Sequence, residues 1–460
     1  MSDVAANDTF RHPSFWTGGT LRSFAAALLV LLAARLAWGW HFAAKVRAHV
    51  DASRARGEPV SVADVKFPDL PDSDNAFAIF VNAYAARAAG VDSPRSSVLE
   101  YADYPPYGPE WVQLAERSEA MNAKAFALAR KARAVPGARV RAKFDADLRA
   151  PIKGLNDVRL LAERLNDGAQ FMELRGDHVE AVGRLRDMLH VARAVRQDPS
   201  LACQAVAAGV DESACYRARV IGPGLRLRPA DPRAAQVRAA VNELISDLLD
   251  ERALADGLAR ALYADRIALT EQVRRSGAER WAIRPLAESQ IAHEWAAFPS
   301  WIDAARARDW PAAKASIDRL LVASRNHVAE DRPLLGWLAG TGVTDRLSRY
   351  SRWFWEGVPY DRAIEKGFRT IAERRVTAVL LAMQLFRADR DRWPARLDEL
   401  VPAYLNGVPG DPFRAGAPPV GYVVLPKALR NGGDRPLVYF DHGSADPVDP
   451  RAWREPMYDW

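Results

Sequence analysis

One stretch near the start of the chain limits the fold more than any other part. Residues 23–40 read SFAAALLVLLAARLAWGW and carry a single charge, Arg35. As a helix this stretch is about 27 Å long, close to the thickness of the apolar core of a bilayer. Arg35 is near its end, where a long side chain reaches the polar boundary, and Trp38 and Trp40 are favoured at that boundary. We therefore predict a transmembrane helix at residues 23–40, preceded by a cytoplasmic leader at residues 1–22.

Two other interpretations of this stretch stay open. Its uncharged part, residues 23–34, is short and rich in Ala, as is the apolar region of a cleaved signal peptide. A helix of this length can also be buried in a soluble protein. The following residues HFAAKVRAHV continue as an amphipathic helix without a break, which favours a retained anchor. We expect residues 41–72 to form a juxtamembrane helix and then a linker punctuated by Pro.

The charges beside the segment give conflicting signals about its orientation. Two arginines precede it and four basic residues follow it: Arg11, Arg22, Lys45, Arg47, Arg54 and Arg56. A literal count of positive charges places the large C-terminal part in the cytoplasm, although a short leader is easily retained inside. Features of the C-terminal end, given below, favour the opposite orientation.

The rest of the chain has an ordinary globular composition. It has 460 residues, 49% hydrophobic and 27% charged, and this length indicates more than one folded unit. Its 64 basic and 58 acidic residues are interleaved, as on solvated helix faces. No nucleic-acid partner is expected, because such proteins cluster basic residues on one element. Cys203 and Cys215 lie about 18 Å apart along one predicted helix, too far for a disulfide.

We predict that residues 73–373 form an all-α body of helical hairpins. The spacing of apolar residues predicts helices at about residues 73–89, 110–134, 155–174, 178–196, 200–221, 231–276 (one or two helices) and 311–329. No alternating run of β-branched residues argues for a sheet in this region. The stretch LNDGAQFMELRGDHVEAVGRLRDMLHVARAV resembles one tetratricopeptide-type helix pair. No second copy recurs at the ~34-residue period, so a generic antiparallel helix pair is the preferred interpretation.

Few residues of the body point to chemistry. Asp187 precedes His190 by three positions, as in a base held by a carboxylate, but this spacing is also common between neighbours on a helix surface. His293-Glu294 lacks the second His of a zinc-protease helix. The short motifs of nucleotide-binding proteins and serine hydrolases do not occur either. We therefore assign no catalytic residue.

Two aromatic clusters are more distinctive. The first contains Trp295, Phe298, Trp301 and Trp310, and the second contains Tyr350, Trp353, Phe354, Trp355 and Tyr360. Such rings can line a groove for a glycan, a peptide or a membrane surface. The favoured interpretation is an aromatic core between the helical body and the C-terminal unit, because large rings usually serve burial. An enzyme acting on cell-wall glycan would instead place carboxylates beside exposed Trp rings, with Asp309, Glu294 and Glu288 as candidates.

The C-terminal end, residues 374–460, predicts a small α+β module. A helix ends at Trp393-Pro394, a short helix LDELVPAYL ends at Pro409-Gly410, and two strands GYVVL and LVYF follow as an antiparallel pair. This order resembles the C-terminal part of the major pseudopilin of bacterial type II secretion. The matching residues are Ala382, Leu385, Phe386, the turn Asp391-Arg392-Trp393-Pro394, Asp411-Pro412-Phe413 and Gly421-Tyr422-Val423.

The resemblance implies a calcium site in the loop after the last strand. Asp441, Asp446 and Asp449 supply hard oxygen ligands there, although the family's Ser-x-Gly-x-Asp-Gly type of ending is replaced. A plain solvated acidic tail is the alternative. The N-terminus lacks the Phe and Glu of a pilin signal after Gly18-Gly19, so the chain is not expected to be a filament subunit.

These features together predict a location more than a reaction. The order of anchor, linker, helical body and C-terminal module resembles bacterial membrane-anchored helical proteins of unknown function. We expect a single-pass inner-membrane protein with a periplasmic body that acts as an interaction or assembly module for envelope proteins. The alternative is an envelope enzyme acting on cell-wall glycan.

Overall fold

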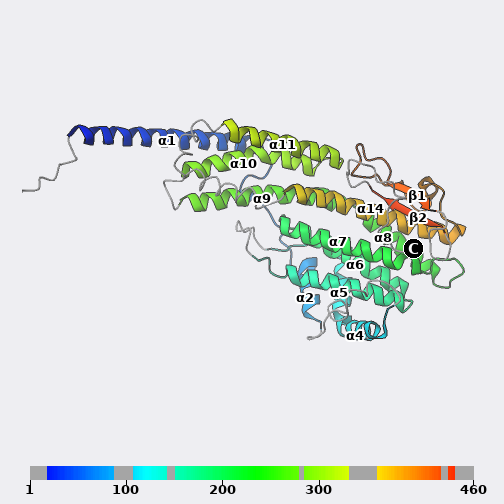
Figure 1. Cartoon of the computed structure of the whole chain (residues 1–460). Coiled ribbons are helices and arrows are strands. Elements are labelled where there is room, and N and C mark those ends of the chain that lie inside the picture. Colours follow the sequence, from blue (N-terminus) through cyan, green and yellow to red (C-terminus); the bar gives the residue numbers. More distant parts are fainter. Residues whose placement is uncertain are drawn as a thin grey trace, which may run out of the picture. The chain divides into compact units, whose positions relative to one another are not determined.

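The structure is a computed structural model that describes residues 18–87, 107–141, 151–278, 284–330, 360–425 and 434–440 (Figure 1). These residues are mainly helical, with one two-stranded sheet near the C-terminus, as predicted. The chain divides into two compact units. The first contains residues 1–57 and 270–296, and the second contains residues 58–269 and 297–460.

The first unit is built from one long helix and parts of two others. α1 (Gly18–Ala55) is unbroken, as the amphipathic continuation of the apolar segment predicts. The unit also contains the end of α9 (Arg252–Ala278) and the start of α10 (Arg284–Ala305). α10 is missing from the predicted helices, because Pro299 lies inside it and aromatic and Ala residues on several faces obscure the helical period.

The second unit contains most of the helices. They are α2 (Ala76–Ala85), α4 (Pro109–Ala132), α5 (Leu155–Leu174), α6 (His178–Val195), α7 (Leu201–Ile221), α8 (Ala234–Leu249), α11 (Trp310–Glu330) and α14 (Tyr360–Arg390), with the remaining parts of α9 and α10. The prediction of an all-α body is confirmed. Residues 231–276, predicted as one or two helices, form two, α8 and α9.

Local sequence signals explain where these helices begin. Between α5 and α6, Gly176 has a φ of 77°, a conformation that favours glycine. Asp177 then caps α6, because its side chain accepts a hydrogen bond from the backbone N–H of Glu180. Ser200 caps α7 in the same way through the backbone N–H of Cys203. The helix pair of the tetratricopeptide-like stretch is therefore an ordinary antiparallel hairpin closed by a glycine turn.

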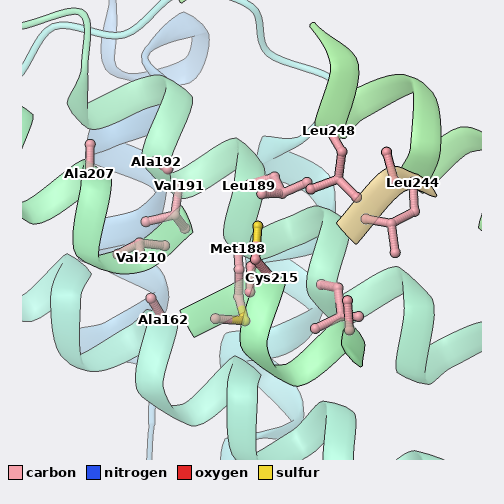
Figure 2. Packing of buried hydrophobic residues seen from close by; sticks show 14 of the residues in the cluster. Ala162, Met188, Leu189, Val191, Ala192, Ala207, Val210, Cys215, Leu244 and Leu248 are labelled. Carbon is pink, nitrogen blue, oxygen red and sulfur yellow. The ribbon is translucent and has the colours of Figure 1, made fainter. Parts of the chain in front are cut away.

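The core of the second unit lies around α6. Met188 and Val191 of this helix pack in one apolar cluster with side chains of α7 and α8 (Figure 2). The partners include Val210 of α7 and Leu244 and Leu248 of α8, and all five side chains are less than 5% exposed. The segment that follows α1 packs in a separate, smaller apolar cluster. Its side chains Val62, Val65 and Phe67 contact Ala264 and Ile267 of α9.

The C-terminal elements agree with the predicted module in part. β1 (Gly421–Leu425) and β2 (Arg435–Tyr439) pair antiparallel, with Gly421 opposite Tyr439, and β2 contacts α14. The predicted helix LDELVPAYL is wrong: only a 3-10 turn forms, η5 (Leu397–Leu400), because Pro402 cannot donate the next helical hydrogen bond. The predicted boundary at residue 374 falls inside α14, which runs without a break to Arg390.

Candidate functional site

The most distinctive surface of the described chain is the N-terminal half of α1. Of the described helices, this is the one long and apolar enough to cross a membrane, and none of its most apolar window is buried. Leu29, Val30 and Trp40 expose 65%, 68% and 72% of their surface. Isolated exposed apolar residues of a soluble protein do not form such a stretch. A membrane span and a signal sequence both have an apolar helix of this kind.

The C-terminal half of α1 has a different environment. Phe42 is half-buried, Val46 is 3% exposed and Ser53 is 2% exposed, and their spacing places them on one face of the helix. The ring of Phe42 lies 6.1 Å from that of His293 on α10, a contact within the first unit. Arg35, seven residues before Phe42 on the same face, is half-buried as well. The exposed apolar surface and the packed face are therefore parts of one continuous helix.

The pair Asp187 and His190 does not form a catalytic dyad. Asp187 is buried and receives hydrogen bonds at 2.9 Å from Arg130 and an ion pair at 3.2 Å from Arg133. The Nε2–H of His190 donates to the carbonyl of Val135 at 3.1 Å. Burial lowers the pKa of His190 to about 4. The two residues are buried rather than on the helix surface as expected, and both bind structural partners of their own.

His178 is the other buried histidine of this hairpin. It is 5% exposed, and neither ring nitrogen has a hydrogen-bond partner in the described part of the chain. Burial lowers its pKa, and the charge of Arg226 acts in the same direction. A neutral ring at the first position of α6 is consistent with this environment, and among the described residues no second side chain hydrogen-bonds to it to form a reactive pair.

The carboxylates named for an envelope enzyme are separated between the two units. Asp309, in the second unit, is buried and structural: Oδ1 caps α11 through the N–H of Ala312 at 2.9 Å, and Oδ2 accepts the N–H of Gly416 at 2.8 Å. Glu288 and Glu294 belong to the first unit, where Glu294 is 6% exposed. Asp309 therefore holds a C-terminal loop and is not presented to solvent.

The first aromatic cluster serves burial. Trp295, Phe298 and Trp301 are 1%, 0% and 7% exposed. The indole N–H of Trp295 donates to the hydroxyl of Thr270 at 3.0 Å, within the first unit. Trp310 lies between the rings of Phe368 and Phe413 in the second unit. The Trp-lined wall that a glycan enzyme requires is not formed by these rings. In the second cluster, residues 350–355 lie outside the described residues, and Tyr360 is buried.

The described residues give little support for a metal site or a reactive cysteine. No group of three or more His, Cys, Asp or Glu side chains there is arranged to hold a metal ion. Asp441, Asp446 and Asp449, the predicted calcium ligands, lie outside the described residues. Cys203 and Cys215 are free and buried, and burial raises the pKa of each thiol to about 12. Both thiols therefore stay protonated and unreactive at neutral pH.

A surface groove of about 670 Å³ lies between α8, the segment before it and the end of α14. Its lining is small and mixed: Pro229, Ala230, Asp231, Pro232, Ala234, Ala235, Arg238, Ala239, Asn242 and Asp389. Its two central charges neutralise each other, because Arg238 binds Asp389 through two hydrogen bonds at 2.8 and 2.9 Å. Tyr404 donates to the same carboxylate at 2.7 Å. Asp231, the third charged residue of the lining, leaves the groove with one more acidic than basic residue. Because its arginine is already paired, the groove offers no free positive charge that would select an anionic ligand.

Two buried polar centres were not predicted from the sequence. Asp211 on α7 binds Arg196 and Arg374, and all three are less than 5% exposed. Asp265 on α9 accepts a hydrogen bond from Tyr360 on α14. The available signal was an acidic residue inside an Ala-rich helix, as in AVAAGVDESA, where a carboxylate in the apolar face requires a buried partner.

Comparisons with protein-family models, curated proteins and solved structures found no match at the significance required.

Proposed function

We propose that this chain is a single-pass protein of the bacterial inner membrane whose helical body lies in the periplasm and acts as an interaction or assembly module for envelope proteins. One observation carries the proposal: the exposed apolar surface of α1 passes within one helix into the packed face formed by Phe42, Val46 and Ser53. A helix built in this way ties a folded body directly to the bilayer.

The continuity of α1 favours a retained anchor over a cleaved signal peptide. Cleavage after the Ala-rich stretch would cut a helix that runs unbroken from Gly18 to Ala55. It would also remove residues next to the half-buried Arg35. A soluble helix is disfavoured for another reason, because burying Leu29 and Val30 would require a partner surface that the described body does not provide.

The interaction role is supported by how the body uses its polar residues. Asp187, His190 and Asp309, which had the best patterns for catalysis, are occupied by structural partners. The described part of the body is otherwise a set of packed helices whose outer faces are available to other proteins. The periplasmic placement is supported by the resemblance of the C-terminal module to a pseudopilin, an envelope protein.

Protease treatment tests the placement. In intact cells and in spheroplasts of a strain carrying the full chain, we expect the body to be protected in cells and digested in spheroplasts. A periplasmic and a cytoplasmic marker protein provide the controls. Extraction with alkaline carbonate should leave the intact chain in the membrane pellet. A body that is protected until the spheroplasts are lysed would overturn the periplasmic placement, and release by carbonate would overturn the anchor.

The assembly role needs a separate measurement. Membranes solubilised in a mild detergent can be separated by size-exclusion chromatography with the chain at its native abundance. We expect the chain to elute in a particle larger than the purified chain in the same detergent. Elution at the size of the purified chain would contradict the assembly role and leave the membrane anchor intact.

A further inference from the structure

One long stretch near the start of the chain contains basic residues and no acidic ones. Residues 9–50 contain five basic residues and no acidic residue, whereas the two signs are mixed in the rest of the chain. Lys45 and Arg47 on α1 are exposed, and neither pairs with a carboxylate in the described part of the chain. The next acidic residue along α1, Asp51, binds Arg54 at 3.0 Å and is not available to them. The ammonium of Lys45 lies 5.4 Å from the centre of the Phe42 ring. Lys45 and Arg47 are therefore two exposed cations that have no carboxylate partner among the described residues.

Their position along α1 matches the depth of lipid headgroups. Lys45 and Arg47 lie about 7 and 10 Å beyond Trp40 along the helix axis, and each polar layer of a bilayer is about 5–8 Å thick. Side chains of a helix tilt toward its N-terminus, so both cations lean back toward the apolar segment. At about 100° per residue they also lie on either side of Val46, which is buried within the first unit.

We propose that Lys45 and Arg47 bind the phosphates of anionic phospholipids where α1 leaves the membrane. This inference rests on the proposed function, because it requires α1 to span the bilayer. Charge complementarity supports this site: two cations with no counterion in the described part of the chain lie at the depth of the lipid headgroups, where anionic lipids carry their phosphates. Each basic residue near such a surface increases the local preference for anionic lipid about fivefold.

Energy transfer in lipid nanodiscs tests this inference. The full chain is reconstituted in phosphatidylcholine nanodiscs that contain a small fraction of dansyl-labelled phosphatidylglycerol or dansyl-labelled phosphatidylcholine. Trp38 and Trp40 are among the donors, and they lie next to the proposed site. We expect stronger transfer to the anionic probe in the native chain. The double variant Lys45→Gln and Arg47→Gln should lose most of the difference, a decrease of about 25-fold in relative preference.

A matched control and three outcomes make the test decisive. Arg54→Gln removes an exposed cation that is already paired with Asp51, so it should keep the anionic preference. Equal transfer to both probes in the native chain, or an unchanged preference in the double variant, would overturn the inference while leaving the anchor in place. Displacement by inorganic phosphate beyond that by chloride at equal ionic strength would assign the cations to a soluble phosphate and also overturn it. Failure of the chain to enter nanodiscs would overturn the proposed function as well.

Discussion

The hydroxyl of Tyr360, the first residue of α14, donates a 2.5 Å hydrogen bond to Asp265 in the middle of α9. Both side chains are buried, at 9% and 7% exposure. Burial raises the pKa of Asp265 to about 6, and the hydrogen bond from Tyr360 opposes this increase. The junction of the two helices therefore contains a carboxyl group that is easier to bury when it is protonated.

The pH dependence of stability should reveal this group. Between about pH 4 and pH 6 the folded chain binds a proton at Asp265 that the unfolded chain has lost, so this residue makes the free energy of unfolding decrease as pH rises. A pKa increase of this size corresponds to about 3 kcal/mol above pH 6. Asp265→Asn keeps an acceptor for Tyr360 and does not titrate. We expect this variant to be more stable than the native chain at pH 8, as measured by urea unfolding.

Tyr360→Phe provides the matched comparison. It removes the donor that lowers the pKa of Asp265, so the decrease in stability should extend above pH 6 and become larger. If Asp265→Asn and the native chain differ by the same free energy at pH 4 and at pH 8, the proposed titration of Asp265 is refuted.

His190 should have the opposite effect on stability. Its pKa is about 4 in the folded chain, against an ordinary value of 6.5, so the unfolded chain binds the extra proton between these two values. The contribution of His190 to the free energy of unfolding is fully present above pH 6.5. About 3 kcal/mol of it is lost as the pH falls to 4. His190→Gln keeps an N–H for the carbonyl of Val135 and does not titrate. Its free energy of unfolding should fall less between pH 7 and pH 4 than that of the native chain. An equal fall in the two proteins would argue against a buried neutral His190.

The buried group of Asp211, Arg196 and Arg374 should dominate the stability of the second unit. Asp211 accepts from Arg374 at 2.7 Å and also binds Arg196, and Arg374 donates to the carbonyl of Leu248 at 3.0 Å. Asp211→Asn leaves two buried guanidinium groups without their counterion. We expect a loss of about 3–5 kcal/mol in the free energy of unfolding.

An exposed ion pair gives the control for Asp211. Lys314 and Asp318 pair at 2.9 Å on α11 with more than half of each side chain exposed. Lys314→Gln should change the unfolding free energy by less than about 1 kcal/mol. Similar losses in the free energy of unfolding for Lys314→Gln and Asp211→Asn would show that the buried ion pairs of Asp211 stabilise the chain no more than an exposed pair.

The sequence predicts where helices begin and end better than it predicts which distant residues contact one another. The end of α5 and the starts of α6 and α7 follow from residues next to them in the chain, at Gly176, Asp177 and Ser200. Asp211 and Arg374 are 163 positions apart, and no local pattern indicates that they meet. His190 and Asp187 illustrate the same limit, because their spacing suggested a surface pair while tertiary packing buried both and supplied other partners. The exposed span of α1 was predictable, since a long apolar run depends on no partner within the chain.

The apolar surface of α1 can be tested separately from the fold of the body. Val30→Asp with Leu31→Asp places two charges in the centre of the predicted span, where each costs about 2.5–3.5 kcal/mol of membrane insertion. We expect this variant to leave the membrane fraction. Its body should unfold at the native temperature, because both side chains are about two-thirds exposed. The control is Leu321→Asp with Val322→Asp, two consecutive exposed apolar residues on α11. This variant should stay in the membrane fraction. The intact mass of the native chain, measured on extracted membranes, separates an anchor from a cleaved signal peptide. A variant at positions 30 and 31 that stays in the membrane but unfolds at a much lower temperature would show that α1 is a buried helix of the body.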